Sequence, residues 1–338
     1  MKNNWKDFFE SRGIKDDFID NYLKYIEYIN KNEIPVIFEV EHLSHLIGIK
    51  YPEINNIIYS PSDFYRKFEI PKRNGGSREI STPYPTLMKC QRWIYENILS
   101  KIPTHQCAYA YKKDHSIIKN ASQHVNNKNI IKIDLKNFFP SIPINWVINL
   151  FVKLGYSNNI PFILAALCCN ENCLPQGAVT SPSLSNILLY SLDDRLFKLS
   201  EKLGLTYTRY ADDMIFSGKH VSPKIIEYIR HIIETYGFEL NNSKTKILSA
   251  DKRKIITGVD ISNNELKLPR RTKREVRKVM FFIKKYGLMN HMSNLKIKNP
   301  NYLLSLEGKI NFWLQIEPTN EEALSYRDII RVLKKWIY

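Results

Sequence analysis

Two adjacent carboxylates, Asp212 and Asp213, stand between two short segments with the composition of β-strands. Residues 205–209 before them are rich in β-branched and aromatic side chains, and residues 214–218 after them are mostly apolar and end at a glycine. This pattern predicts a β-hairpin whose tip is Ala211-Asp212-Asp213. Such a tip would hold both carboxylates rigidly and clear of the core, as a site for hard divalent cations requires. An ordinary turn is the alternative, because aspartate is common in turns for purely local reasons.

A third carboxylate, Asp134, interrupts a strand-like run of β-branched residues at 129–135. Burying a carboxylate is costly unless it is paired or binds a metal. One strand with an acid and one hairpin with two acids can converge on two divalent ions, which catalyse in-line phosphoryl transfer. We expect Asp134 and Asp212 to bridge two Mg²⁺ ions with Asp213 nearby, because Mg²⁺ prefers oxygen ligands; Mn²⁺ is the alternative metal.

The charge balance points to a polyanionic partner. Fifty Lys and Arg residues oppose 34 Asp and Glu residues, which gives a formal net charge of +16. This excess suits either nucleic acid or an acidic membrane surface. Twenty tyrosines favour nucleic acid, because flat rings stack on bases beside cations that bind phosphate. The acids would then hold metal ions while the cations follow the polymer.

Several other classes of protein are not favoured. The longest apolar run, residues 160–169, is about half of the ~20 residues that a membrane span requires. The first residues lack the apolar core of a signal peptide. Five cysteines without Cys-x-x-Cys spacing favour reduced core thiols over a zinc site. We therefore expect a cytoplasmic protein with no membrane partner.

The elements that must position the acids alternate along the chain. Residues 1–60 carry apolar repeats at helical spacing, and two strands joined by a Gly75-Gly76 turn follow from residue 64. Around the acids, the order strand, helices, strand and hairpin strand is a βαββ unit, which suits a mixed sheet backed by helices. A further strand is expected at 255–261. The expected helices cover residues 87–99, residues 143–170, a segment that ends near residue 203, and residues 223–236.

Residues 267–285 form a dense basic segment. They include nine Lys or Arg residues and a single acid, Glu275. Apolar residues such as Val276 and Met280 recur at helical spacing, which predicts a helix with one apolar and one basic face. A basic face can be merely solvated, but the net charge of the chain favours contact with a phosphate backbone.

Four segments resemble the ordered palm motifs of reverse transcriptases. They are Ile133–Phe139, Pro175-Gln176-Gly177 with Thr180-Ser181-Pro182, Tyr210-Ala211-Asp212-Asp213, and Asn241-x-x-Lys244-Thr245. The resemblance extends from about residue 64 to residue 313 and implies RNA-directed DNA polymerase activity. It also implies an α+β right-hand polymerase fold with fingers, a βαββ palm and a helical thumb. On this basis we expect a helical N-terminal extension at 1–60, fingers and palm at 61–250, and the palm end with an RNA-binding thumb at 251–338.

Two further elements narrow the resemblance to the bacterial retron branch. Asn120-Ala121-Ser122-Gln123-His124 is similar to the Asn-Ala-x-x-His element of that branch, and Ile256-Thr257-Gly258 resembles its Val-Thr-Gly element with Ile in place of Val. The branch implies an enzyme that binds a structured non-coding RNA of its own retron and primes from the 2′-OH of a guanosine. Its product is branched RNA–DNA (msDNA). Its implied partners are dNTPs, this RNA, the RNA–DNA product and an effector protein. The enzyme and its effector would belong to an anti-phage defence system, and oligomers would form only through the complex with the effector and msDNA.

The resemblance also implies residue roles around the incoming nucleotide. The candidate nucleotide-binding residues are Lys72, Arg73, Arg78, Phe139 and Gln176. The three cations match finger residues that grip the triphosphate. Phe139 matches the aromatic that crowds a ribose 2′-OH, and Gln176 resembles a residue that positions the nucleotide. Lys244 matches a lysine proposed to protonate the pyrophosphate leaving group. Core packing for Phe139 and a surface charge for Lys244 are the alternatives.

Candidate RNA contacts lie outside the palm motifs. They are Asn120, His124, Thr257, Gly258, Arg270, Arg271, Arg274 and Arg277. Structured RNA is recognised through shape, loops and 2′-hydroxyls, which suits a module beside the palm. His124 could equally be a satisfied buried histidine. Two alternatives stay open for the whole chain: a group II intron-like or diversity-generating reverse transcriptase, and an RNA-binding scaffold or antitoxin in a defence complex.

Overall fold

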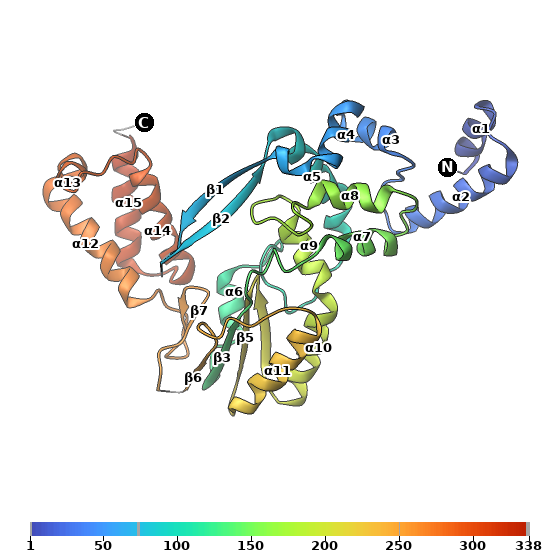
Figure 1. Ribbon diagram of the computed structural model, residues 1–338. Coiled ribbons are helices and arrows are strands. Elements are labelled where there is room, and N and C mark those ends of the chain that lie inside the picture. Colours follow the sequence, from blue (N-terminus) through green and yellow to red (C-terminus); the bar gives the residue numbers. More distant parts are fainter. Residues whose placement is uncertain (1, 73–74, 250, 336–338) are drawn as a thin grey trace. The chain divides into compact units, whose positions relative to one another are not determined.

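The computed structural model describes residues 2–72, 75–249 and 251–335 (Figure 1). The chain divides into two compact units. The first comprises Met1–Tyr111, Leu135–Leu196 and Ile229–Asn241, and the second comprises Lys112–Asp134, Phe197–Tyr228 and Asn242–Tyr338. The domain boundaries expected near residues 60 and 250 stay a prediction.

Four helices begin the first unit. They are α1 (Lys2–Ser11), α2 (Asp16–Lys31), α3 (Val40–Ile47) and α4 (Tyr51–Tyr59), and a short 3₁₀ turn at Pro61–Phe64 follows. Two aspartates in the first turn of α2 complement the helix dipole, and its buried face includes Ile19, Ile26 and Ile29. Helix α3 ends at Gly48, whose φ of +71° makes the left-handed cap that glycine adopts readily.

The rest of the first unit joins a hairpin to a group of helices. It comprises β1 (Tyr65–Pro71), β2 (Ser77–Pro83), α5 (Pro85–Asn97), a 3₁₀ turn (Leu99–Lys101), α7 (Ile144–Lys153), α8 (Ile160–Cys168) and α9 (Ser181–Leu188). The strands β1 and β2 pair antiparallel, so the hairpin predicted around Gly75-Gly76 is confirmed. The stretch expected to be helical at 143–170 is two helices. The chain turns between them at Gly155, where φ is +100° and a Cβ atom would lie 2.2 Å from the Tyr28 ring.

A four-stranded sheet forms the centre of the second unit. Its strands are β3 (Asn129–Asp134), β4 (Thr206–Tyr210), β5 (Asp213–Gly218) and β6 (Lys246–Leu248), in the order β4-β5-β3-β6. The predicted hairpin is confirmed, with Tyr210 paired to Asp213 and only Ala211 and Asp212 in the turn. The expected mixed sheet is wrong, because neighbouring strands in it pair antiparallel. The crossover does make β3 and β4 run in the same direction, but the hairpin inserts β5 between them.

One face of this sheet is covered by short elements of the second unit. Helix α6 (Ile117–Ser122) and the strands β7 (Ile255–Ile256) and β8 (Val259–Asp260) share a hydrophobic cluster with Ile130 of β3 and Ile215 of β5. The single strand expected at 255–261 is therefore a small hairpin. Thr257 and Gly258 form its turn, with φ values of +45° and +87°.

Helices make up the C-terminal part of the second unit. They are α12 (Arg270–Tyr286), α13 (Leu288–Asn294), α14 (Tyr302–Ile316) and α15 (Glu321–Lys335). The predicted apolar face of α12 is buried at Val276, Met280 and Ile283, in the same cluster as the fully buried Trp313. Two more helices, α10 (Tyr190–Lys202) and α11 (Pro223–Thr235), precede and follow the β4–β5 hairpin in the chain.

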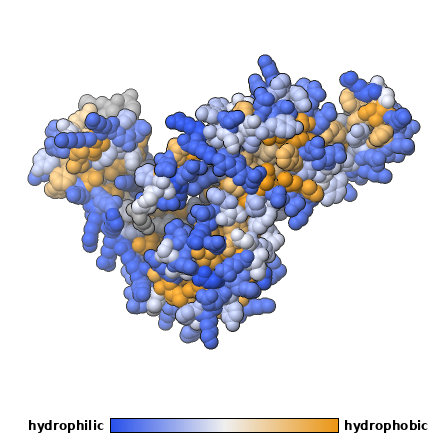
Figure 2. All heavy atoms as spheres, in the orientation of Figure 1, coloured by the Kyte–Doolittle hydropathy of each residue, from blue (hydrophilic) through white to orange (hydrophobic). Residues whose placement is uncertain are grey.

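Helices combined with an antiparallel sheet confirm the α+β class. Hydrophilic residues dominate the visible face of the molecule, with hydrophobic side chains scattered between them (Figure 2). Over the described ranges, no helix has both the length and the apolar character needed to cross a membrane.

Candidate active site

Three carboxylates meet on adjacent strands of the four-stranded sheet. Asp134 ends β3, Asp213 begins β5, and the two are register partners, so their side chains project from the same face. Asp212 lies in the turn beside them. Burial raises the pKa of Asp212 to about 6, and repulsion by Asp213 and Asp134 adds to this shift while Lys244 opposes it. Burial also raises the pKa of Asp213, Lys132 opposes the shift, and Asp134 adds to it. The acids predicted to converge are therefore close enough to repel one another.

A buried arginine supports the turn that carries these acids. Ala211 has a φ of +57°, a left-handed conformation that is unfavourable for a residue with a Cβ atom. Arg209 is fully buried, and its Nη1 atom donates a hydrogen bond to the Ala211 carbonyl oxygen at 3.2 Å. Arg209 was not among the site residues expected from the sequence. Its signal was a single cation within the strand-like segment, two residues before the turn.

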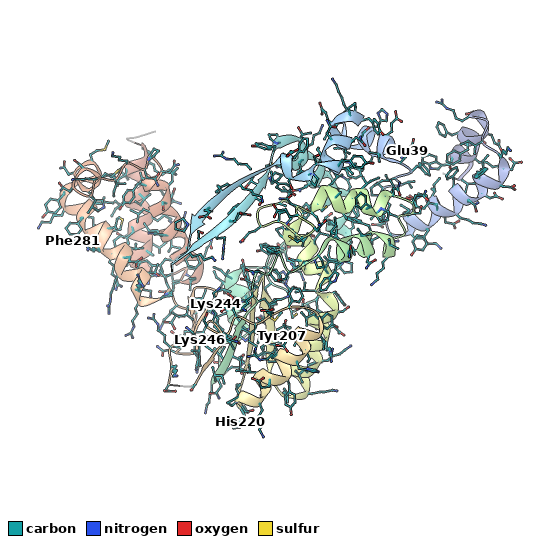
Figure 3. The ribbon with its side chains drawn as sticks, in the orientation of Figure 1. Glu39, Tyr207, His220, Lys244, Lys246 and Phe281 are labelled. Carbon is teal, nitrogen blue, oxygen red and sulfur yellow. The ribbon has the colours of Figure 1, made fainter. Side chains whose placement is uncertain are left out.

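Lys244 binds the first of the three acids. Its Nζ atom donates to both carboxylate oxygens of Asp134, at 2.9 Å and 2.8 Å. The Asp134 side chain is 9% exposed and that of Lys244 is 52% exposed, so the lysine reaches inward from the surface. Lys244 lies just before β6, the strand that pairs with β3 on the side away from β5 (Figure 3). The motif order predicted this lysine near the acids, and the structure brings it into direct contact.

The donor set fits hard divalent cations. Within the described ranges, no three Asp, Glu, His or Cys side chains are already arranged around a common metal position. The Lys244 ammonium group instead donates hydrogen bonds to both carboxylate oxygens of Asp134. The donors are carboxylate oxygens on two paired strands and in the adjoining turn, which suits Mg²⁺ or Mn²⁺, and a bound cation would relieve their mutual repulsion. The residues therefore fit such ions by their chemistry, with Lys244 as the competing cation.

The expected nucleotide-binding residues of the fingers lie in the first unit. Arg78 is exposed on β2, and Lys72 is exposed just after β1; Arg73 lies outside the described residues. The loop that carries Gln176 is joined to β2, because the Ser81 backbone N–H donates to the Gln176 carbonyl oxygen at 2.8 Å. The structure thus brings the Gln176 loop against the hairpin that carries Arg78.

Gly177 permits this close approach of the loop to β2. Its φ is +125°, and a Cβ atom there would lie 2.9 Å from both the Ile80 Cγ2 atom and the Ser81 carbonyl oxygen. A side chain at this position would therefore force the two backbones apart. The buried Gln91 secures the same loop, because its Oε1 atom accepts a hydrogen bond from the Val179 N–H at 3.0 Å.

Phe139 is partly exposed rather than buried in the core. Its ring lies 5.2 Å from the Phe138 ring and 6.4 Å from the Tyr111 ring, measured between centroids. Phe138 is the buried member of the pair and packs near Phe238. Phe139 is thus neither fully buried nor fully exposed, and both its role beside the nucleotide and the alternative of core packing stay predictions.

Two of the expected RNA contacts are not on the surface. Asn120 and His124 are both 0% exposed. The His124 ring is hydrogen-bonded to the Ser217 and Thr208 hydroxyls, and the Asn120 amide has no hydrogen-bond partner among the described residues. The expectation that either side chain contacts RNA directly is therefore wrong. Both face the interior because α6 packs across the sheet, and His124 is the satisfied buried histidine that the sequence left open.

The remaining candidates for RNA contact differ in their surroundings. The Thr257 hydroxyl donates to the Ile117 carbonyl oxygen at 3.1 Å, whereas Gly258 is exposed. On α12, Arg277 binds both carboxylate oxygens of Glu322, and Arg271 pairs with Glu275 one turn along the helix. Arg270 and Arg274 are also exposed, and neither has an ion pair within the described ranges.

Comparison with known proteins identifies a family and a branch. The model of the family "Reverse transcriptase (RNA-dependent DNA polymerase)" matches residues 70–289. The retron Ec86 reverse transcriptase of Escherichia coli is 32% identical over 264 residues, covering 75% of this chain and 82% of that protein. The retron Ec73 reverse transcriptase of the same species is 35% identical over 294 residues, covering 80% of this chain and 89% of that protein.

A solved structure of telomerase from Candida albicans, in complex with a fragment of telomeric RNA, has a TM-score of 0.44. It is 10% identical in sequence and covers 78% of this chain and 60% of that chain. A likeness of this size supports no statement about the fold or function of the protein.

Proposed function

We propose that this chain, which belongs to the retron branch of the reverse transcriptase family, copies the RNA of its own retron by two-metal nucleotidyl transfer. As a member of that family it is an RNA-directed DNA polymerase. The family and the combination of helices with strands fit a right-hand polymerase fold. We assign the β1–β2 hairpin to the fingers, the four-stranded sheet to the palm, and helices α12 to α15 to the thumb.

One observation carries this proposal: Asp134 and Asp213 are partners on neighbouring strands, Asp212 lies in the adjoining turn, and Lys244 binds Asp134. In the proposal Asp134, Asp212 and Asp213 hold two Mg²⁺ ions, because carboxylate oxygens on a rigid sheet are suitable ligands for that ion. Bound ions would activate the attacking oxygen and neutralise charge on the leaving pyrophosphate. The Arg209 guanidinium stabilises the backbone of the turn that presents two of the acids.

Lys244 has two successive roles in this proposal. Without metal it neutralises the charge of Asp134, a nearly buried carboxylate. Its half-exposed and flexible side chain allows the ammonium group to leave Asp134 and donate a proton to the pyrophosphate. The same residue then serves first as a counter-ion and afterwards as a general acid.

The incoming nucleotide is handled by residues of the first unit. Exposed Lys72 and Arg78 can contact a triphosphate without breaking a buried interaction. The joined Gln176 loop would position the nucleotide, and the partly exposed Phe139 ring would exclude a ribose 2′-OH. These four roles rest on the resemblance, and the exposure of Lys72 and Arg78 supports the first two.

RNA contact is proposed for one exposed stripe of α12. Arg270, Arg274, Lys278, Phe281 and Lys285 recur every three or four residues, so they share one face of the helix. Phe281 is 57% exposed, and its ring, labelled in Figure 3, lies 5.9 Å from the Lys285 ammonium nitrogen. Cations for phosphates beside an aromatic ring for a base are typical of contacts with unpaired RNA. Exposed Gly258 stays a candidate contact through its backbone.

The retron relatives support the rest of the proposal. The template is a structured non-coding RNA, the primer is the 2′-OH of a guanosine, and the product is branched RNA–DNA. An effector partner, a role in defence against phage and a cytoplasmic place of action belong to the same proposal.

The nucleic acid that co-purifies with the protein tests this proposal. We expect an RNA of defined sequence linked to DNA through a 2′–5′ branch, so that debranching enzyme should release the DNA as a separate strand. Unbranched cDNA with an ordinary 3′-primed end would contradict the priming reaction while leaving polymerase activity intact.

A further inference from the structure

His124 connects the two strands that carry the Asp212–Asp213 turn. Its Nδ1 atom is 2.6 Å from the Ser217 Oγ atom on β5, and its Nε2 atom is 2.7 Å from the Thr208 Oγ1 atom on β4. The ring is 0% exposed, and burial lowers its pKa to about 3, so the imidazole is neutral. A neutral imidazole donates from one nitrogen and accepts at the other, so both hydrogen bonds form without a buried charge.

The two hydroxyls are diagonal neighbours rather than direct partners. In the β4–β5 ladder Ser217 pairs with Thr206, and Thr208 pairs with Ile215. A link between Thr208 and Ser217 therefore spans an offset of two residues and resists sliding of one strand along the other. Sliding matters here because the turn that joins β4 to β5 carries Asp212 and leads into Asp213, so sliding would displace these carboxylates.

The link and the acids share one face of the sheet. Ser217, Ile215 and Asp213 alternate along β5, so all three project to the same side. Ser217 is four residues from Asp213, about 13 Å along an extended strand. His124 thus binds the middle of β4 and the far part of β5, while Arg209 supports the turn itself.

The element that carries His124 is itself fixed in place. Asn127 donates a second hydrogen bond to the Ser217 Oγ atom at 2.8 Å. Helix α6 is held by the Thr257 hydroxyl, which binds the Ile117 carbonyl oxygen, and Ala121 is fully buried with Ile256 in one apolar cluster. The two elements that the sequence assigned to RNA contact therefore pack together behind the hairpin.

We propose that His124 is a positioning residue for polymerisation, which fixes the register of β4 against β5 and so the placement of Asp212 and Asp213 for metal binding. This inference rests on the proposed two-metal function. His124 touches neither the acids nor a substrate, so it acts only through the hairpin.

Binding of Mn²⁺ alone to the purified protein, followed by the electron paramagnetic resonance signal of the free ion, tests the proposal. His124→Phe keeps a flat ring and removes both hydrogen bonds. We expect it to weaken Mn²⁺ binding about tenfold, the size of effect that supporting residues of metal sites show. His124→Gln, which keeps one polar end, should recover part of the loss. Thr208→Val should add no further loss in the His124→Phe background, because the shared bond is already gone.

Affinity for a poly(rA)·oligo(dT) primer–template separates positioning from RNA binding. We expect His124→Phe to leave that affinity unchanged and to raise the Mg²⁺ concentration for half-maximal primer extension. Weaker primer–template binding with unchanged Mn²⁺ affinity would overturn the proposal. If His124→Phe does not fold, the near-isosteric Thr208→Val carries the test, with an expected loss of about threefold in Mn²⁺ affinity. Unchanged Mn²⁺ affinity in folded Thr208→Val would also overturn it.

Asp213→Asn in the same titration separates the positioning role of His124 from the proposed two-metal function. If Asp213→Asn weakens Mn²⁺ binding and His124→Phe does not, only the positioning role fails. If Asp213→Asn leaves Mn²⁺ binding unchanged, the two-metal function fails and the positioning role fails with it.

Discussion

The ammonium nitrogen of Lys244 lies 2.9 Å and 2.8 Å from the two carboxylate oxygens of Asp134. A cation of the protein itself therefore binds one of the three proposed metal ligands. The two residues are 110 positions apart in the chain. Their contact joins the strand β3 to the segment before β6 within the second unit. Metal ions must therefore compete with an internal cation for Asp134.

Removing this competing cation should strengthen metal binding and slow the reaction. Lys244→Met keeps the length of the side chain and removes its charge. We expect higher Mn²⁺ affinity in equilibrium titration, because Asp134 loses its internal partner, and slower nucleotide addition, because the general acid is lost. Lys246→Met, an exposed lysine two residues later, is the matched control and should alter neither quantity much. Unchanged or weaker Mn²⁺ binding in Lys244→Met would show that the two cations do not compete.

An alanine at Gly177 should disturb nucleotide binding as well as stability. Alanine at a positive φ costs about 1–2 kcal/mol of folding free energy, and Gly177→Ala also places a Cβ atom 2.9 Å from the Ser81 carbonyl oxygen. The loop should move away from β2 and carry Gln176 with it, which raises KM for dNTPs in primer extension. Gly237→Ala controls for backbone strain, because Gly237 has a φ of +77° and open space around it. Equal KM values for the two variants would rule out the role of the loop.

Burial of His124 predicts a specific dependence of stability on pH. Its pKa falls from 6.5 in the unfolded chain to about 3 in the folded protein, so between these values the unfolded chain binds the extra proton. Stability from this group is complete above pH 6.5 and is lost as the pH falls, by about 2 kcal/mol between pH 7 and pH 5. Urea unfolding at both pH values should show this extra loss in the wild type and not in His124→Gln. Equal losses in the two proteins would mean that His124 is not buried in its neutral form.

Two arginines one turn apart on α12 should behave differently. Arg274 is exposed without an ion pair among the described residues, whereas Arg277 binds Glu322 and lies 5.8 Å from the Trp313 ring. Arg274→Gln should weaken RNA binding and reduce the slope of log affinity against log salt by about one. Arg277→Gln should mainly lower the free energy of unfolding. Similar salt slopes for Arg274→Gln and the wild type would remove Arg274 from the RNA surface.

The sequence predicted local elements well and the contacts between distant elements poorly. The hairpin around Asp212 and the strand that ends at Asp134 follow from β-branched composition and turn residues, which act over a few positions. The insertion of β5 between β3 and β4 depends on the pairing of distant strands, so the mixed sheet was expected in error. Likewise, the sequence left His124 open between RNA contact and burial, and only the packing of α6 against the sheet shows that it is buried.

The paired substitution Asp212→Asn and Asp213→Asn tests the assignment of these carboxylates to the metal site most directly. The amount of DNA that it makes is measured by primer extension on an RNA template across a range of Mg²⁺ concentrations. RNA binding is measured on the same preparations. We predict a loss of DNA synthesis of about a thousandfold, equivalent to about 4 kcal/mol of transition-state stabilisation, with RNA binding retained. DNA synthesis at the wild-type rate, with the same dependence on Mg²⁺, would contradict the assignment of these carboxylates to the metal site.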